Sequence, residues 1–167
     1  LTVNGSDSSV VCTYTNTRKS ATLTLRKTWS NAKLNDAATV SATGLTSLSS
    51  TADTANETDA GTAQTVYAGD VLTLSETITT GAGNYTAGLA CTGNTTALSG
   101  SQLTVNGSDS SVVCTYTNTR KSATFRIAKA WGANSISGNV AQIAATTGLT
   151  NNTSALTSTA PTNLNGS

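Results

Sequence analysis

The chain has 167 residues, of which 10% are charged, and its formal net charge is +1. Threonine, alanine and serine are its most frequent residues and proline occurs once, a composition that favours short β-strands over helices. Lysine and arginine form no cluster larger than a pair, as at Arg18-Lys19 and Arg120-Lys121, so we expect no nucleic-acid partner. No run of about 18 apolar residues occurs, and we expect no membrane insertion by this segment.

The most informative feature of the sequence is an internal repeat. Residues 1–22, LTVNGSDSSVVCTYTNTRKSAT, recur without change at 103–124, and each copy is followed by related residues, LTLRKTW at 23–29 and FRIAKAW at 125–131. This pattern indicates a unit of about 102 residues that is copied in tandem. We expect a complete repeat at 21–122, the C-terminal strand of a preceding repeat at 1–20 and the N-terminal part of a following repeat at 123–167. We also expect the polypeptide to continue beyond both ends.

Seven short strands are predicted within the complete repeat by alternation of apolar and polar residues between turns rich in glycine and asparagine. The first strand places Leu23, Leu25, Lys27 and Trp29 on one face. The other six are expected at 37–43, 63–68, 71–79, 85–91, 102–106 and 111–119. This number of strands in about a hundred residues predicts an all-β fold, with each repeat an Ig-like two-sheet sandwich.

Three of these strands carry one polar residue on the face that should point to the core. Lys27 lies between Leu25 and Trp29 on the first strand. Glu76 shares a face with Leu72, Leu74 and Ile78, and Asn118 shares a face with Val112, Cys114 and Tyr116. A lone buried ammonium or carboxylate is costly, so we expect Lys27 and Glu76 to meet, with Asn118 beside them.

Two interpretations of this trio follow from the residues. In the first, Lys27 and Glu76 form a buried ion pair and Asn118 is a hydrogen-bond partner. In the second, burial favours the neutral forms of an amine and a carboxyl group, so that the Lys27 amine attacks the amide carbon of Asn118. Glu76 would catalyse the proton transfers, ammonia would leave, and an isopeptide crosslink would remain. Lys129 and Asn16 are the corresponding half-sites of the neighbouring repeats.

The three cysteines fit the repeat as one pair per copy. Cys91 and Cys114 belong to the complete repeat, and Cys12 is the counterpart of Cys114 in the copy before it. A Cys91–Cys114 disulfide would stabilise the fold by about 3 kcal/mol and would imply an oxidising compartment. Two free buried thiols are the alternative. Histidine is absent and the cysteine spacing does not match a zinc site, so we expect no metal and no other cofactor.

A set of spaced motifs resembles a known family of bacterial surface modules. These motifs are an inward Lys in LRKTW, the Glu of LSETITTGAGNY, LACTG, and the Asn of CTYTNTRK. They resemble the collagen-adhesin B-type (CnaB) and SpaA-like prealbumin-fold modules of adhesins and pili, and the tandem repeats of large secreted surface proteins. The resemblance implies prealbumin-like sandwiches, with Lys27 as nucleophile, Asn118 as acceptor and Glu76 as catalyst. Gram-positive modules usually lack the cysteine pair, in which this chain differs.

These features bear differently on three classes of function. The leading prediction is a structural repeat of a bacterial extracellular filament or long adhesin stalk, whose partners are neighbouring repeats or identical subunits. The second is a surface module in which rows of outward threonine bind a carbohydrate lattice or ice, although threonine is also common on solvated strand faces. An enzyme acting on an external substrate is disfavoured because no histidine, phosphate-binding loop or nucleophile elbow occurs.

In one further arrangement, the two half-sites Lys129 and Asn16 would come from different subunits. The final strand at 9–17 of one chain could add to residues 123–167 of another, so that Lys129 faces Asn16. We favour a continuing polypeptide, because 123–167 lacks counterparts of the strands expected at 71–79 and 85–91.

Overall fold

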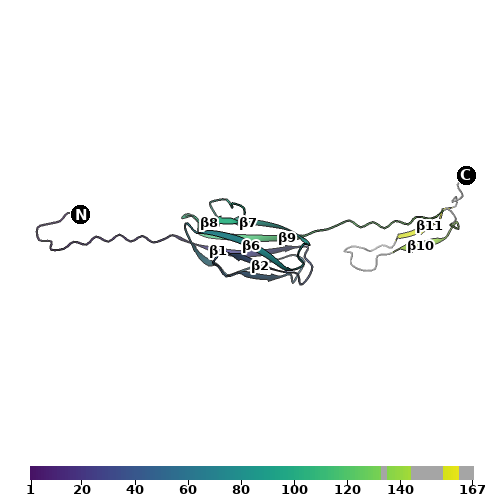
Figure 1. Cartoon of the computed structure of the whole chain (residues 1–167), viewed down its shortest axis with the longest axis horizontal. Coiled ribbons are helices and arrows are strands. Elements are labelled where there is room, and N and C mark those ends of the chain that lie inside the picture. The colour runs from purple at the N-terminus through teal and green to yellow at the C-terminus, as the bar shows by residue number, and fades with distance from the viewer. Residues whose placement is uncertain (133–134, 144–155, 162–167) are drawn as a thin grey trace. The chain divides into compact units, whose positions relative to one another are not determined.

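The structure of the chain is a computed structural model, which describes residues 1–132, 135–143 and 156–161. It divides into two units, Leu1–Lys121 and Ser122–Ser167. Every regular element in the described residues is a β-strand (Figure 1). The predicted all-β class is therefore confirmed, whereas the tandem arrangement of repeats stays a prediction.

One sheet of the first unit carries the first and last strands of the predicted repeat. Its order is β4 (Glu57–Ala60), β1 (Ser20–Ser30), β9 (Ser111–Arg120) and β7 (Tyr85–Thr92), and β5 (Gln64–Tyr67) also pairs with β1. β1 and β9 are parallel neighbours, with Thr22 opposite Ser111 and Ser30 opposite Thr119. All the other pairs in this sheet are antiparallel. The parallel pair is possible because most of the repeat lies between its two strands.

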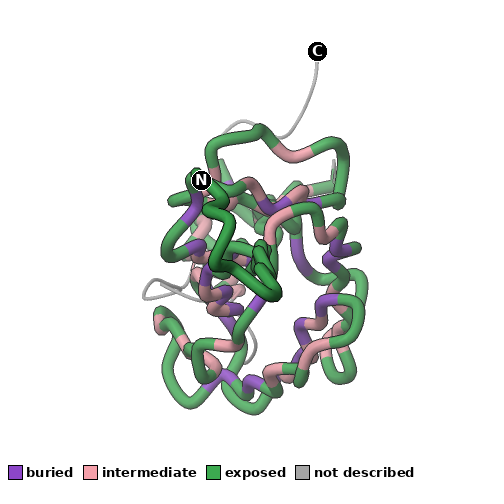
Figure 2. Tube along the Cα trace, turned by 90° about the vertical axis from the view of Figure 1, so that its left-hand side faces the viewer, coloured by how far each residue is buried: buried purple, intermediate pink, exposed green. Residues whose placement is uncertain are grey.

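The second sheet faces the first. Its order is β3 (Leu48–Thr51), β2 (Ala37–Ala42), β6 (Val71–Thr80) and β8 (Gln102–Thr104), and all of its pairs are antiparallel. Strict alternation on β1 and β9 buries every second residue between the sheets. Figure 2 shows short buried stretches alternating with intermediate and exposed ones along the chain trace. The larger apolar cluster includes Leu23, Leu25, Val40, Leu74, Leu103 and Val112. The fold of the first unit is thus a two-sheet sandwich around one interior.

Two strands of the first unit were not predicted from the sequence. β3 has the sequence LSST and β4 has the sequence ETDA, and both are four residues long. Neither contains a run of alternating apolar residues, and each lies at the end of a sheet path. The six strands expected after the first are all present, with ends that differ from the prediction by one or two residues.

The repeated sequence adopts different structures in its two copies. Residues 103–120 contribute to β8 and β9, and β9 lies between β1 and β7. The identical residues 1–18 contain no strand, and Val11 and Tyr14 are exposed. Pairing with neighbouring strands, rather than the local sequence, therefore decides whether this segment forms a strand.

The described part of the second unit contains one strand pair. β10 (Val140–Ile143) and β11 (Leu156–Thr159) are antiparallel, with Ala141 opposite Ser158. In the first unit β2 and β3 pair in the same way, with Ala38 opposite Ser50. The NH of Ala160 bonds to the carbonyl of Asn139, as that of Ala52 bonds to Asp36. The second unit therefore reproduces a local part of the first.

Candidate functional site

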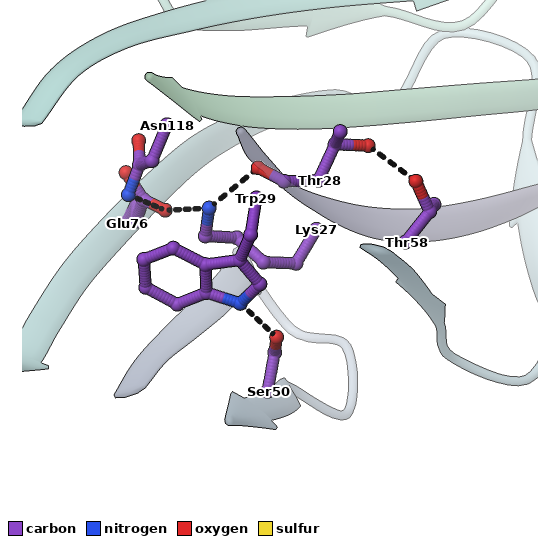
Figure 3. Close-up of polar contacts among 7 residues, drawn as sticks. All are labelled: Lys27, Thr28, Trp29, Ser50, Thr58, Glu76 and Asn118. Atoms are coloured by element: carbon purple, nitrogen blue, oxygen red, sulfur yellow. Dashed lines mark hydrogen bonds and ion pairs between the residues drawn. The ribbon is translucent and has the colours of Figure 1, made fainter. Parts of the chain in front are cut away.

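Lys27, Glu76 and Asn118 come together in the interior of the first unit (Figure 3). Lys27 and Asn118 lie on the adjacent parallel strands β1 and β9, and Glu76 lies on β6 of the opposite sheet. All three side chains point inward because each occupies the same parity as the apolar residues of its strand. Lys27 and Asn118 are fully buried, and the Glu76 side chain is 6% exposed.

The contacts among the three residues centre on one carboxylate oxygen. Lys27 Nζ lies 3.5 Å from Glu76 Oε1, and Asn118 Nδ2 donates a hydrogen bond of 3.0 Å to the same oxygen. Lys27 Nζ also donates to the backbone carbonyl of Thr28 at 2.9 Å. The carboxylate thus lies within reach of both the amine and the carboxamide that a crosslink would join.

The other oxygen of the trio has no partner. Asn118 Oδ1 is buried and accepts no hydrogen bond. An unpaired buried polar atom costs about 1–3 kcal/mol. Rotating the carboxamide by half a turn would exchange its oxygen and nitrogen, and a protonated Glu76 could then donate to Oδ1. A rotated carboxamide together with one proton on the carboxyl group would thus give Asn118 Oδ1 a partner in Glu76, an arrangement that differs from the observed bond from Asn118 Nδ2 to Glu76 Oε1.

Burial lowers the pKa of Lys27 below the usual range of a lysine, although the Glu76 carboxylate and Asp59 act in the opposite direction. Burial also raises the pKa of the nearby Tyr116 hydroxyl, and the charge of Glu76 adds to this effect. The interior at this position therefore disfavours charge, which assists the loss of a proton from Lys27.

Trp29 covers the lysine ammonium with its indole ring. Lys27 Nζ lies 3.7 Å from the ring centroid, and the indole Nε1 donates to Ser50 Oγ at 2.8 Å from the facing sheet. The second unit contains the same arrangement: Lys129 Nζ lies 4.1 Å from the Trp131 ring, and Trp131 donates to Ser158 at 3.0 Å. Sequence reasoning found the lysines and tryptophans but gave no signal for the two serines.

A second buried polar contact also escaped the sequence analysis. The Tyr85 hydroxyl donates to Asp36 Oδ2 at 2.5 Å and accepts from the NH of Lys33, and the Tyr85 ring meets Trp29 edge to face. Burial and the bond to Asp36 raise the pKa of Tyr85. This contact ties the start of β7 to the segment between β1 and β2, and no motif marks it because Asp and Tyr are common at strand ends.

The cysteines and the half-sites are placed as follows. Cys91 and Cys114 form a disulfide between β7 and β9. Cys12 is a free, exposed thiol, and Asn16 is exposed in the segment before β1. Lys129 donates to the carbonyl of Ala130, besides its contact with Trp131. Neither Cys12 nor Asn16 is brought to a partner in the described residues.

The chain matched no family model, no curated protein and no solved structure when it was compared with them. Within the described residues, histidine, cysteine, aspartate and glutamate form no group of three or more that could hold a metal ion. The same residues contain no helix with the length and apolarity needed to cross a bilayer.

Proposed function

We propose that this chain is a structural repeat of a bacterial extracellular filament or adhesin stalk, fastened internally by an isopeptide bond between Lys27 and Asn118. The observation that carries the proposal is the buried convergence of Lys27, Glu76 and Asn118 from both sheets. This geometry is what the resemblance to CnaB and SpaA-like prealbumin modules leads us to expect. An unreacted ion pair is the alternative state of the same site.

The proposed reaction proceeds in balanced steps. Transfer of a proton from the Lys27 ammonium to the Glu76 carboxylate gives a neutral amine and a carboxylic acid. The acid donates a hydrogen bond to Asn118 Oδ1 and polarises the carbonyl, and the amine lone pair attacks the amide carbon. The Lys27 nitrogen then loses its remaining extra proton, the Asn118 nitrogen gains one and leaves as ammonia, and a Lys–Asn amide bond remains. Glu76 carries these protons and ends as the carboxylic acid, and transfer of its proton to the released ammonia, which departs as ammonium, regenerates the carboxylate.

The position of the crosslink supports a mechanical role. β1 and β9 are parallel neighbours, so opposite forces on the two ends of the unit load all their hydrogen bonds together in shear. A covalent bond between Lys27 and Asn118 would carry the same load. The Cys91–Cys114 disulfide fastens β7 to β9 as well.

Partners and location follow from the same proposal. Neighbouring repeats, or identical subunits in a fibre, would be the partners, and residues 1–20 would complete the repeat that precedes them. The disulfide is compatible with an oxidising, extracellular compartment. We place the protein at the bacterial cell surface because of the family resemblance.

The crosslink is tested by the intact mass of the full chain. Ammonia release lowers the mass by about 17 Da, and formation of the disulfide lowers it by about 2 Da more. Glu76→Gln should retain the ammonia because the variant lacks the proton carrier. Glu57→Gln is the matched control, because Glu57 is the only other glutamate and caps the backbone NH groups of Asp53 and Thr54. An unchanged mass of the unsubstituted chain would refute the crosslink and leave the ion pair.

A second candidate function rests on the outer face of the same sheet. Thr28 lies opposite Thr117 on one side and Thr58 on the other, and its hydroxyl is 2.9 Å from that of Thr58. Thr119 lies opposite Thr86 in the next row. Regular rows of hydroxyl and methyl groups suit a repetitive ligand such as ice or a carbohydrate lattice. Altered ice-crystal growth or sedimentation with crystalline polysaccharide, both lost in Thr28→Lys, would support this function.

A further inference from the structure

The sequence Arg-Lys-Ser-Ala-Thr occurs twice, at 18–22, where β1 begins, and at 120–124, where β9 ends. The two copies have the same sequence but contact different parts of the first unit. Together they show two sets of contacts that one copy of this sequence can make. The two sets can therefore be compared atom by atom.

The first copy is fixed to the turn between β5 and β6, which follows it in the chain. Arg18 Nη2 donates to the carbonyl of Ala68 at 2.9 Å and to Asp70 Oδ1 at 2.6 Å, and its guanidinium lies over the Tyr67 ring. The backbone NH of Ala68 donates to the carbonyl of Lys19 at 2.9 Å. Hydrogen bonds from the Tyr67 backbone and from Arg18 lower the pKa of Asp70, so the carboxylate is charged at neutral pH.

The second copy is fixed to the turn between β6 and β7, which precedes it in the chain. The backbone NH of Lys121 donates to the carbonyl of Asn84 at 2.8 Å, and Lys121 Nζ donates to the carbonyl of Gly83 at 3.0 Å. Lys121 is the copy of Lys19. The same lysine therefore uses its backbone carbonyl in one copy and its backbone NH in the other, and the two bonds do not compete.

We propose that this Arg-Lys pair is a two-sided joint between adjacent repeats. The inference rests on the proposed tandem array: Lys19 would donate its NH to the Asn84-position carbonyl of the preceding repeat while its carbonyl accepts from Ala68 of the following one. Residue 18 would close the preceding β9 and Ser20 opens the next β1, where it pairs with Tyr67. No residue between the two repeats is left unanchored, so the junction resists bending. The partner that this surface fits is another copy of the repeat.

Both halves of the joint can be tested on the full chain by hydrogen exchange and by trypsin. We expect slow exchange at the amides of Ala68 and Lys121. Lys19, Lys121 and Arg126 are all exposed outside the strands, but the Lys19 carbonyl is bonded to Ala68 and the Lys121 NH to Asn84, so cleavage after either lysine should be about tenfold slower or more than after Arg126. Arg18→Ala should speed exchange at Ala68 about two- to fivefold and leave Lys121 unchanged, as expected for one exposed ion pair. Arg120→Ala is the matched control and should leave Ala68 unchanged.

Rapid exchange at either amide, or cleavage after Lys19 as fast as after Arg126, would overturn the joint. The result is separate from that of the crosslink, which intact mass reports. Protected amides in a chain that retains its ammonia would support the joint and refute the isopeptide. Unprotected amides in a chain that has lost about 17 Da would refute the joint but not the isopeptide.

Discussion

At the scale of single residues, the interior of the sandwich holds charge only where partners surround it. Lys27 has an ion-pair partner, a backbone acceptor and an aromatic face, all within 3.7 Å or less of Nζ. Removing one member of a buried pair leaves the other unpaired at a cost of about 3–5 kcal/mol, whereas an apolar replacement of both members is often tolerated. Single and double substitutions in the trio should therefore differ sharply in their effect on the free energy of unfolding.

Glu76→Ala should be less stable than the double variant Lys27→Met/Glu76→Ala by about 3 kcal/mol, because methionine fills the lysine site without a charge. Neither variant can crosslink, so denaturant unfolding compares folded states of the same covalent structure. The control is Glu57→Ala added to Lys27→Met/Glu76→Ala, which cannot crosslink either and should lose only the stability that the Glu57 contacts with Asp53 and Thr54 supply. Equal stability of the Glu76 single and double variants would contradict a buried, charged Lys27.

Tyr85 offers a test of pH dependence. Its pKa is raised in the folded state, so the stabilisation from its protonated hydroxyl is complete below about pH 10 and is lost as the pH rises through the folded-state value. Tyr85→Phe removes the bond to Asp36 and should lower the free energy of unfolding by about 1–3 kcal/mol at pH 7. The gap between the two proteins should shrink above pH 10 in denaturant titrations. A constant gap would show that the hydroxyl does not titrate in this contact.

At the scale of elements, β9 takes part in the disulfide, in the proposed isopeptide bond and in two strand pairs. It pairs with β1 on one side and β7 on the other, and it carries Cys114 and Asn118 four residues apart on one face. Cys91 pairs directly with Cys114 in the β7–β9 register, so the disulfide reinforces an existing strand pair. Loss of the disulfide should weaken the hold on β9 without displacing the Lys27–Glu76–Asn118 trio.

Cys91→Ala/Cys114→Ala should lower the free energy of unfolding by about 3 kcal/mol, the value expected for a loop that closes over a sequence separation of 23. Cys12→Ala is the matched control and should have no effect, because Cys12 is free and exposed. Denaturant midpoints under oxidising conditions measure both changes. A similar loss in Cys12→Ala would show that this thiol takes part in a contact outside the structure described above.

Strand alternation made much of this arrangement predictable from sequence. The alternation places Lys27 and Asn118 inward on β1 and β9, and the repeat pairs Cys91 with Cys114 rather than with Cys12. β3 and β4 were not predictable because LSST and ETDA, four residues each at a sheet edge, contain no alternation of apolar and polar residues. The Trp29–Ser50 and Tyr85–Asp36 bonds also escaped prediction, since each joins segments whose proximity exists only after the sheets have packed.

At the scale of the whole first unit, the first and last strands are adjacent and parallel. Tension applied through the two chain ends enters at the start of β1 and leaves at the end of β9, so it acts along their shared hydrogen bonds. Shear of this kind requires many bonds to break at once. The proposed Lys27–Asn118 bond would sit directly across the loaded strands, and residues between these two positions would be shielded from extension.

Single-molecule stretching of the full chain under reducing conditions tests this shielding. The segment between Lys27 and Asn118 contains about 90 residues, and its release adds roughly 300 Å at 3.3–3.6 Å per residue. The unsubstituted chain should lack this step because the crosslink closes the segment. Lys27→Met/Glu76→Ala should show it, at a force set by non-covalent shear alone. We expect the double variant to keep the fold while it removes the reactive groups. A full-length step in both proteins would therefore mean that hydrogen bonds, and not a covalent bond, carry the load.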